Sequence, residues 1–475
     1  MSDPSQIPPA TIPRDFPDWL SPTIVKEVRQ GLRSHVFAIA FMLLHLLLIF
    51  WCLGSIAGSA SDSSGSNAVF WAIFFVGLAA LIFRGLGAVR SEIRGNTLEL
   101  LQLTRQSAWK IIFGKWSSLL LQILLFIASL LPYAVLRYFF GAIEPMNDIF
   151  LFSFALFFAV ILSAFVTFIS CYGIWLSIIA GLFGLSLLYF IPVTLLWVGG
   201  VSLDFETLGQ LLGACAVFAG YALVYAATFL FLAAGKIASV SDNLATRKRL
   251  AALLLLLPPW IALLAEADKE IMFSTMMAAL PAAIVLIDAV LTPTSPAIPA
   301  FKPFNRAGIL GRLTAFLLGP SQGGGILFSL LALALFFSPL ILQTGDRDLF
   351  IIALSTASTL LLPFALTRLG HRLFPRMGFL GRYFIFVLLE CLLFAVAVLL
   401  RAMDAVPLLA GTASVLSYFS PLTLLFLSDS GSWTTNFGIS FTIFFLVSIV
   451  LAPFVIRDFL AVNRMCRGER GELPR

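Results

Sequence analysis

Long runs of apolar residues, separated by short polar segments, follow one another along almost the whole chain. Each run is about 20 residues long, which is the length that an α-helix needs to cross the hydrocarbon core of a bilayer. The apolar residues are continuous within each run and do not alternate with polar ones, so the pattern predicts helices and not the strands of a β-barrel. Twelve runs of this kind lie near residues 36–57, 68–88, 116–140, 149–172, 177–199, 208–234, 250–266, 271–291, 323–343, 349–369, 383–403 and 437–457. The predicted fold class is therefore all-α: a polytopic integral membrane protein with about 12 transmembrane helices.

The composition supports a membrane protein. Of the 475 residues, 60% are hydrophobic and only 11% are charged, whereas soluble domains contain about 25% charged residues. Lipid is therefore expected to surround most of this chain.

The lysines and arginines are concentrated in every second segment between the apolar runs. With a cytoplasmic N-terminus, 26 of the 30 lysines and arginines fall on the inner side, in agreement with the positive-inside rule. This assignment places both termini in the cytoplasm and explains the formal charge of +6 through topology, so no nucleic-acid partner is expected. It requires the apolar segment 406–430, which Pro407, Gly411 and Ser420-Pro421 interrupt, to be re-entrant or to lie on the outer surface.

The expected organisation has two membrane halves. The second half includes a proline-rich, basic cytoplasmic linker at 292–322, and no convincing sequence repeat relates the halves. The expected segments are an N-terminal cytoplasmic segment at 1–35, a first six-helix half at 36–240, a second six-helix half at 241–457 and a basic cytoplasmic tail at 458–475.

An amphipathic helix is expected just before the first run. Ser21 is a suitable N-cap and Pro22 a suitable first helical residue. Apolar positions recur at i, i+3 and i+7, and basic positions follow one residue later: Val25, Val28 and Leu32, then Lys26, Arg29 and Arg33. Such a helix lies in the membrane interface, with its basic face toward anionic headgroups. The simpler alternative is an anchor beside the membrane with no other role.

The polar segment 89–115, called the elbow below, follows the second run. Gly95-Asn96 interrupts a helix, and Asn96 with Glu99 forms a start that is similar to a capping box. Glu92 and Glu99 are seven residues apart and so share one helical face, which favours a docking surface for a soluble partner. The alternative is an ordinary solvated loop that contains acidic residues by chance.

The elbow resembles the pattern that follows the second helix of type 2 ABC exporter permeases. The matching residues are Glu92, Gly95, Thr97–Leu101, Leu103, Thr104, Ser107, Ile111, Gly114 and Lys115. Residues 21–30 are similar to the amphipathic entry helix of that family, and residues 416–422 are weakly similar to its broken outer hairpin. The chain departs from the pattern at Asn96, which is inserted, and at Arg105, where proline is usual.

The resemblance implies a permease subunit in the bacterial inner (plasma) membrane, which exports an unidentified substrate and is driven by a separate ATPase subunit. A second permease subunit or a second copy of this chain would complete the assembly. The residues that would couple to the ATPase are Glu92, Gly95, Thr97, Glu99 and Thr104 in the elbow, bordered by Lys26, Glu27, Arg29 and Arg33.

No catalytic or metal site is expected in the chain itself. A phosphate-binding loop needs a lysine that is followed by serine or threonine, and no lysine here is followed by either. ATP and Mg²⁺ would therefore bind to the partner subunit, and this chain would hold no cofactor. The five cysteines lack the spacing of a metal site.

Ionisable residues inside the apolar runs suggest an alternative function. Glu390, Asp288 and His45 lie within such runs, where a charge is unfavourable unless it has a role or a partner. A proton-coupled secondary transporter would use Glu390 or Asp288 as its proton carrier. Equally, Glu390 can be a protonated carboxyl packed between helices, and His45 a packed polar residue. A lipid-modifying enzyme would need acids or histidines clustered at one membrane face, and the sequence indicates no such cluster.

Overall fold

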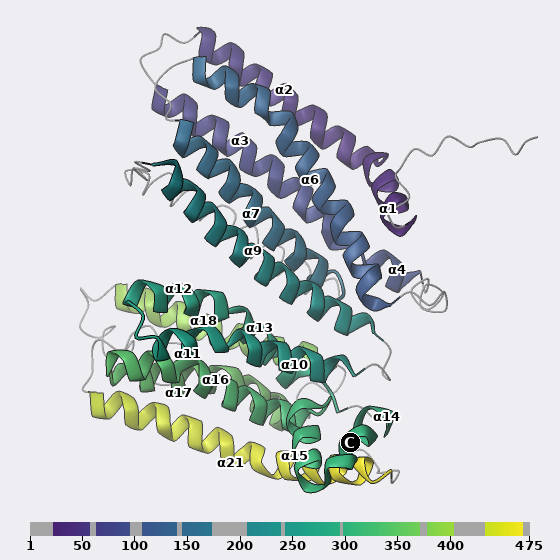
Figure 1. Cartoon of the computed structure of the whole chain (residues 1–475), viewed down its shortest axis with the longest axis vertical. Coiled ribbons are helices and arrows are strands. Elements are labelled where there is room, and N and C mark those ends of the chain that lie inside the picture. Colours follow the sequence, from purple (N-terminus) through teal and green to yellow (C-terminus); the bar gives the residue numbers. More distant parts are fainter. Residues whose placement is uncertain are drawn as a thin grey trace, which may run out of the picture. The chain divides into compact units, whose positions relative to one another are not determined.

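The computed structural model describes residues 22–57, 63–95, 107–139, 145–172, 207–238, 243–294, 298–370, 378–402 and 433–468. All regular secondary structure in these segments is helical, which confirms the all-α class. Nine helices among them are long and apolar enough to cross a membrane. The chain divides into two compact units, Met1–Ile237 and Ala238–Arg475. Both are visible in Figure 1, and each is described separately below.

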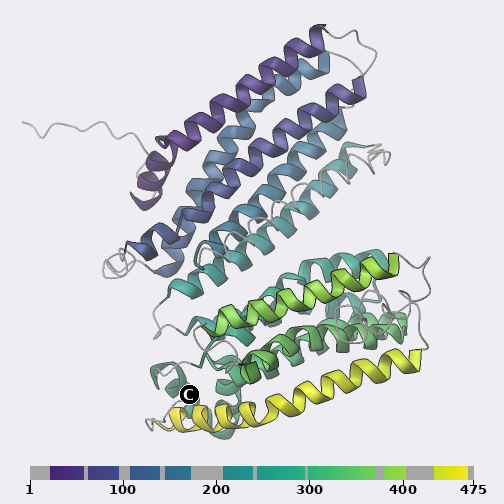
Figure 2. The same ribbon diagram turned by 180° about the vertical axis from the view of Figure 1, so that it is seen from behind.

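Unit 1 is a bundle of long helices with a short helix, α1, at one end. The third helix, α3, continues through a 3₁₀ turn, η2, toward the short helix α4, which lies at the same end as α1 (Figures 1 and 2). The elements are α1 (Pro22–Leu32), α2 (His35–Ala57), α3 (Ser63–Arg84), η2 (Gly85–Gly87), α4 (Arg90–Arg94), α6 (Ala108–Phe139), α7 (Pro145–Ile169) and α9 (Leu208–Ile237).

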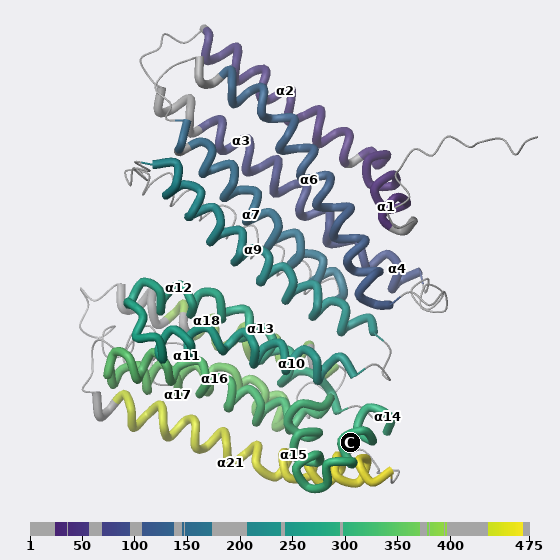
Figure 3. The backbone as a smooth tube through the Cα atoms, viewed as in Figure 1, coloured from purple at the N-terminus to yellow at the C-terminus, as the bar shows by residue number. Residues whose placement is uncertain are grey.

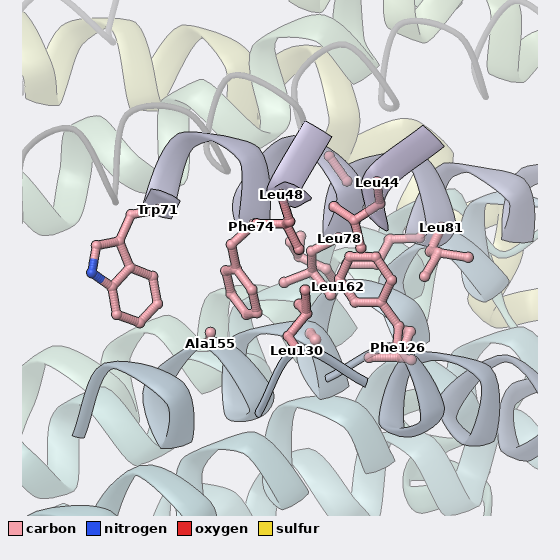
Figure 4. Packing of buried hydrophobic residues seen from close by; sticks show 14 of the residues in the cluster. Leu44, Leu48, Trp71, Phe74, Leu78, Leu81, Phe126, Leu130, Ala155 and Leu162 are labelled. Carbon is pink, nitrogen blue, oxygen red and sulfur yellow. The ribbon is translucent and has the colours of Figure 1, made fainter. Parts of the chain in front are cut away.

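The core of unit 1 is built from aromatic and aliphatic side chains of α2, α3, α6 and α7 (Figure 4). Trp71 and Phe74 meet edge to face with their ring centroids 5.4 Å apart, and Phe74 also contacts Phe126. The outer surfaces of the same helices expose large apolar residues such as Met42 and Val76. Because lipid is as apolar as these side chains, the helices are held together by close packing rather than by the exclusion of water.

Unit 2 contains more helices, because prolines divide its first two apolar runs. Pro258 and Pro259 lie in the first turn of α11, and Pro281 is the first residue of α13; the first turn is the part of a helix that accommodates a proline most easily. The elements are α10 (Leu244–Leu255), α11 (Leu257–Leu264), α12 (Lys269–Ala279), α13 (Pro281–Leu291), α14 (Ile298–Phe301), η3 (Lys302–Ala307), α15 (Gly308–Leu318), α16 (Gln322–Thr344), α17 (Asp348–Leu369), α18 (Phe379–Ala402) and α21 (Trp433–Cys466).

The segment 292–322, expected as a linker, is largely helical. Its helices α14 and α15 lie beside the C-terminal end of α21 (Figures 1 and 2). Phe301 and Phe316 are buried there against Val462 and Met465. These large side chains explain why the proline-rich segment folds instead of remaining an extended connection.

The helices of the two units pair in the same order. The first, second, third, fourth and last long helices are α2, α3, α6, α7 and α9 in unit 1, and α10–α11, α12–α13, α16, α17 and α21 in unit 2. In each unit the first packs on the second, the second on the third and the third on the fourth, while the last packs on both the third and the fourth. The two units thus share an order of helix pairing that is not evident in the sequence, whereas α18 of unit 2, which packs on α17, has no counterpart among the described residues of unit 1. The backbone of both units is drawn as a tube in Figure 3.

The predicted count of 12 spans is only partly represented by the nine helices. The runs at 177–199 and 406–430 lie outside the described residues. The run expected at 250–266 is divided between α10, of 12 residues, and α11, of 8 residues, each too short to cross a bilayer alone. The run at 383–403 forms α18. The count of 12 and the cytoplasmic position of the termini stay predictions.

Candidate functional site

Lys115 joins three helices at one end of unit 1. Its ammonium Nζ lies 2.8 Å from a carboxylate oxygen of Glu92, on α4, and 3.3 Å from a carboxylate oxygen of Glu27, on α1. The lysine is buried, with 7% of its surface exposed. A buried ammonium is unfavourable unless it is paired, and the two carboxylates provide that pairing for Lys115 at this position of α6. We call these three residues the Lys115 triad.

A second polar contact between the same elements involves Arg84, the last residue of α3. Its guanidinium donates one hydrogen bond to the side-chain oxygen of Gln122 at 2.6 Å and another to the carbonyl of Gly31 at 2.9 Å. Gly31 allows the close approach, because a Cβ at this position would lie 2.3 Å from the Gln122 amide nitrogen. Helix α1 is therefore fixed to the bundle both by the Lys115 triad and by Arg84.

The structure brings together some of the expected coupling residues. Glu27 and Glu92 meet at Lys115. Lys26 and Arg29 are exposed on α1, and Arg33 is exposed directly after it. Gly95 follows directly after α4 as its C-cap. The remaining candidates, Thr97, Glu99 and Thr104, lie outside the described residues.

Sequence reasoning did not assign roles to Lys115, Arg84 and Gln122 in this contact. A signal was available, since Lys115, Ser118 and Gln122 recur at i, i+3 and i+7 along an otherwise apolar helix. That spacing places a polar stripe on one helical face, and in a membrane helix such a stripe faces protein rather than lipid. All three residues of the stripe are buried.

The intramembrane candidates have three different environments. In unit 1, His45 Nδ1 lies 3.3 Å from the Tyr133 hydroxyl, and its ring packs edge-on against Phe41. In unit 2, Asp288 forms a buried ion pair with Lys248. Glu390 is also buried in unit 2, near the middle of α18, with 6% of its surface exposed.

A buried polar network holds one end of unit 2 together, where α10, α13, α15, α16, α17 and α21 meet. Asp458 on α21 accepts hydrogen bonds from the Thr294 hydroxyl and from the backbone N–H of Gly323, both at 2.7 Å. Arg368 on α17 bonds to the Gln322 side chain and lies over the Phe454 ring, 4.0 Å from its centroid. The segment Ser321–Gly325, which opens α16, is the centre of this network.

Arg249 belongs to the same network. Its guanidinium donates to the carbonyls of Leu317 at 2.7 Å, Ser321 at 2.8 Å and Ala289 at 3.4 Å. Burial lowers the pKa of Arg249 to about 10, while the carboxylates of Asp288 and Asp458 oppose the shift. Arg249 therefore remains a cation at neutral pH. It donates hydrogen bonds to carbonyls near the C-terminal ends of α13 and α15, where the helix dipole favours a positive charge.

Among the described residues, no group of three or more histidines, cysteines, aspartates or glutamates is placed to hold a metal ion. The polar sites found there are ion pairs and hydrogen-bonded networks at helix ends.

Fold and site together define a multi-pass helical membrane protein. No protein-family model, curated protein or solved structure matches this chain.

Proposed function

We propose that this chain is the membrane-spanning permease subunit of an ABC exporter, in a bacterial inner membrane, driven by ATP that a separate ATPase subunit hydrolyses. The proposal includes about 12 spans and cytoplasmic termini, which the distribution of basic residues favours. The observation that carries it is the Lys115 triad, because the triad links α1 to Glu92 and Lys115, which lie near the two ends of the elbow that resembles a coupling element.

The triad offers a route for mechanical coupling. The part of the elbow between Gly95 and Ser107 is attached directly to α4 on one side and to α6 on the other. A force on this segment would act on both helices, and the pairing of Lys115 with Glu27 would transmit it to α1. Coupling of this kind needs a packed element with two discrete arrangements that the partner can bias.

The proposal assigns ATP and Mg²⁺ to the partner. This assignment is supported by the sequence, in which no lysine is followed by the serine or threonine that a phosphate-binding loop requires. The chain itself would have no catalytic residue.

Purification of the tagged full chain from its native membranes tests the proposal. We expect a polypeptide with a phosphate-binding loop to co-purify and to hydrolyse ATP. Replacing residues 97–104 with a Gly/Ser segment of equal length should remove this partner. The control is Asp348→Lys, which changes an exposed acid at the start of α17, in unit 2, and should leave the partner bound. Equal recovery of the ATPase with the replaced elbow would overturn the proposal.

The alternative is a proton-coupled secondary transporter, and the burial of Glu390 favours it. Asp288 is the weaker candidate for a proton carrier, because Lys248 already neutralises it in an ion pair. Proteoliposomes that contain only this chain distinguish the two functions. Transport driven by a pH gradient alone and lost in Glu390→Gln would establish the alternative, whereas an ABC permease without its ATPase should be inactive.

A further inference from the structure

A cavity of about 560 Å³ lies between α1, the end of α3 with η2 and α4, and the start of α6. Sites for small molecules have volumes of about 300–1,000 Å³, so the cavity has the size of a binding site. It is lined by Lys26, Glu27, Arg84, Glu92, Lys115 and Gln122, together with smaller residues.

The charged side chains that line the cavity have a net charge of +1. Lys115 is engaged by Glu27 and Glu92, which leaves the Lys115 triad negative by one charge. Lys26 and Arg84 contribute two positive charges on other parts of the wall. Arg84 bonds to Gln122 and Gly31 through two of its five N–H groups, so its guanidinium has further donors to offer.

The position of the cavity fits the headgroup layer of a bilayer. Arg84 is near the end of the second apolar run and Lys115 directly precedes the third. Helix α1 has the amphipathic, basic pattern of a helix that lies in the interface. Apolar lining from Leu119 and Ala88 accompanies the polar groups, as a glycerol backbone or the start of an acyl chain would require.

We propose that this cavity binds a phosphate group, which either the headgroup of an anionic phospholipid or a soluble phosphate ester supplies. Lys26 and Arg84 are the cations that receive it, because guanidinium and ammonium groups are the usual partners of phosphate. The Lys115 triad lines the same cavity and keeps α1 in place. This site does not depend on the proposed transport function, since binding needs neither ATP nor a partner subunit.

Two substitutions test the site without disturbing the buried contacts. Lys26→Glu reverses an exposed charge, and its matched control is Lys110→Glu, an exposed lysine on α6 that does not line the cavity. Gly87 lines the cavity, and Gly87→Leu adds a bulky side chain to its wall without a clash, because a Cβ on Gly87 would meet no atom within 4 Å. Its control is Gly220→Leu on α9, where a Cβ would also meet no atom within 4 Å and which is not one of the residues that line this cavity.

Lipid retention by the full chain is the readout. The protein is extracted from nanodiscs of phosphatidylglycerol and phosphatidylcholine, and retained lipid is counted by native mass spectrometry. We expect one tightly held phosphatidylglycerol, with retention reduced about tenfold or more in Lys26→Glu and Gly87→Leu and unchanged in the two controls.

A second arm adds glycerol 3-phosphate or inorganic phosphate at millimolar concentration. Displacement of the lipid, or saturable binding of the soluble phosphate that Lys26→Glu abolishes, would assign the site to a soluble phosphate ester. Retention that is equal in the wild type and both cavity variants, together with no binding of soluble phosphate, would overturn the proposal.

Discussion

The Asp458 carboxylate accepts a hydrogen bond from the backbone N–H of Gly323 at 2.7 Å, across 135 residues of sequence. The bond places an acid from α21 at the start of α16, where unpaired N–H groups and the helix dipole favour a negative charge. Asp458 is fully buried, and Arg368 and Arg249 are near enough to stabilise its charge.

Asp458→Ala should therefore destabilise unit 2 by about 3 kcal/mol, because it leaves buried donors and cations without their partner. Asp458→Asn should be milder, since it keeps one acceptor oxygen. Thermal unfolding of the detergent-solubilised protein, followed by tryptophan fluorescence, measures both. Asp348→Asn, at an exposed position, provides the control, and an equal effect there would show that the buried network is not responsible.

Lys115→Met should weaken the attachment of α1, because it removes the cation that Glu27 and Glu92 share. We expect a loss of about 3 kcal/mol, the usual consequence of removing one partner from a buried ion pair. The double variant Lys115→Met/Glu92→Gln should recover part of that loss, since one of the two like charges is gone. Protease cleavage around residues 32–35 reports the release of α1. If the losses of stability caused by the two substitutions simply add, Lys115 and Glu92 are not energetically coupled.

Arg249→Lys should be destabilising even though it keeps the charge. The planar guanidinium reaches the carbonyls of Leu317, Ser321 and Ala289 together, and a single ammonium cannot. We expect a cost of about 2 kcal/mol, measured as a lower Tm. Arg247→Lys, an exposed site on the same helix, should have almost no effect.

The pH dependence of this difference follows from the direction of the pKa shift. Burial lowers the pKa of Arg249 in the folded state to about 10, below its ordinary value. The unfolded chain therefore binds more protons than the folded chain only above about pH 10. The contribution of Arg249 to the free energy of unfolding should rise with pH in that range and stay constant at lower pH. The difference in Tm between the wild type and Arg249→Lys should therefore be flat from about pH 6 to pH 9. A slope within that window would show that another group controls the site.

Gly325→Ala should disrupt the start of α16, because a Cβ there would lie 2.0 Å from the carbonyl oxygen of Ala289. The backbone would have to move, at a cost of about 2 kcal/mol or more. Gly213→Ala on α9 is the control. Its Cβ would meet nothing within 4 Å, and alanine has the higher helix propensity, so this variant should not be destabilised. Similar Tm values for the two variants would contradict the close packing at Gly325.

The sequence predicted much of the helical framework. Apolar length alone located the runs that became α2, α6, α7, α9, α16, α17 and α21, because length and continuity are what a bilayer requires. Ser21-Pro22 likewise predicted a helix start that the structure has at Pro22. The division at Leu256 was missed, since a run can be apolar throughout and still be broken where Pro258 and Pro259 follow.

The polar contacts could be predicted only in part. Glu27 and Glu92 were identified as candidates from their places in two separate motifs, but their shared partner Lys115 depends on how α1, α4 and α6 pack. Asp458 and Gly323 are a stronger example, because no local pattern links residues that far apart. Such contacts follow from tertiary packing, which a single sequence does not encode in any short window.

The common order of helix pairing means that each unit closes its own bundle with its own helices. Two bundles encoded on one chain need not stay identical, as the subunits of a homodimer must. The region between the second and third long helices differs between the units: in unit 1 it contains Glu92 and Glu99, whereas in unit 2 no acid occurs between Asp288 and Asp346. One order of helix pairing can therefore support two bundles whose connecting segments carry different chemistry.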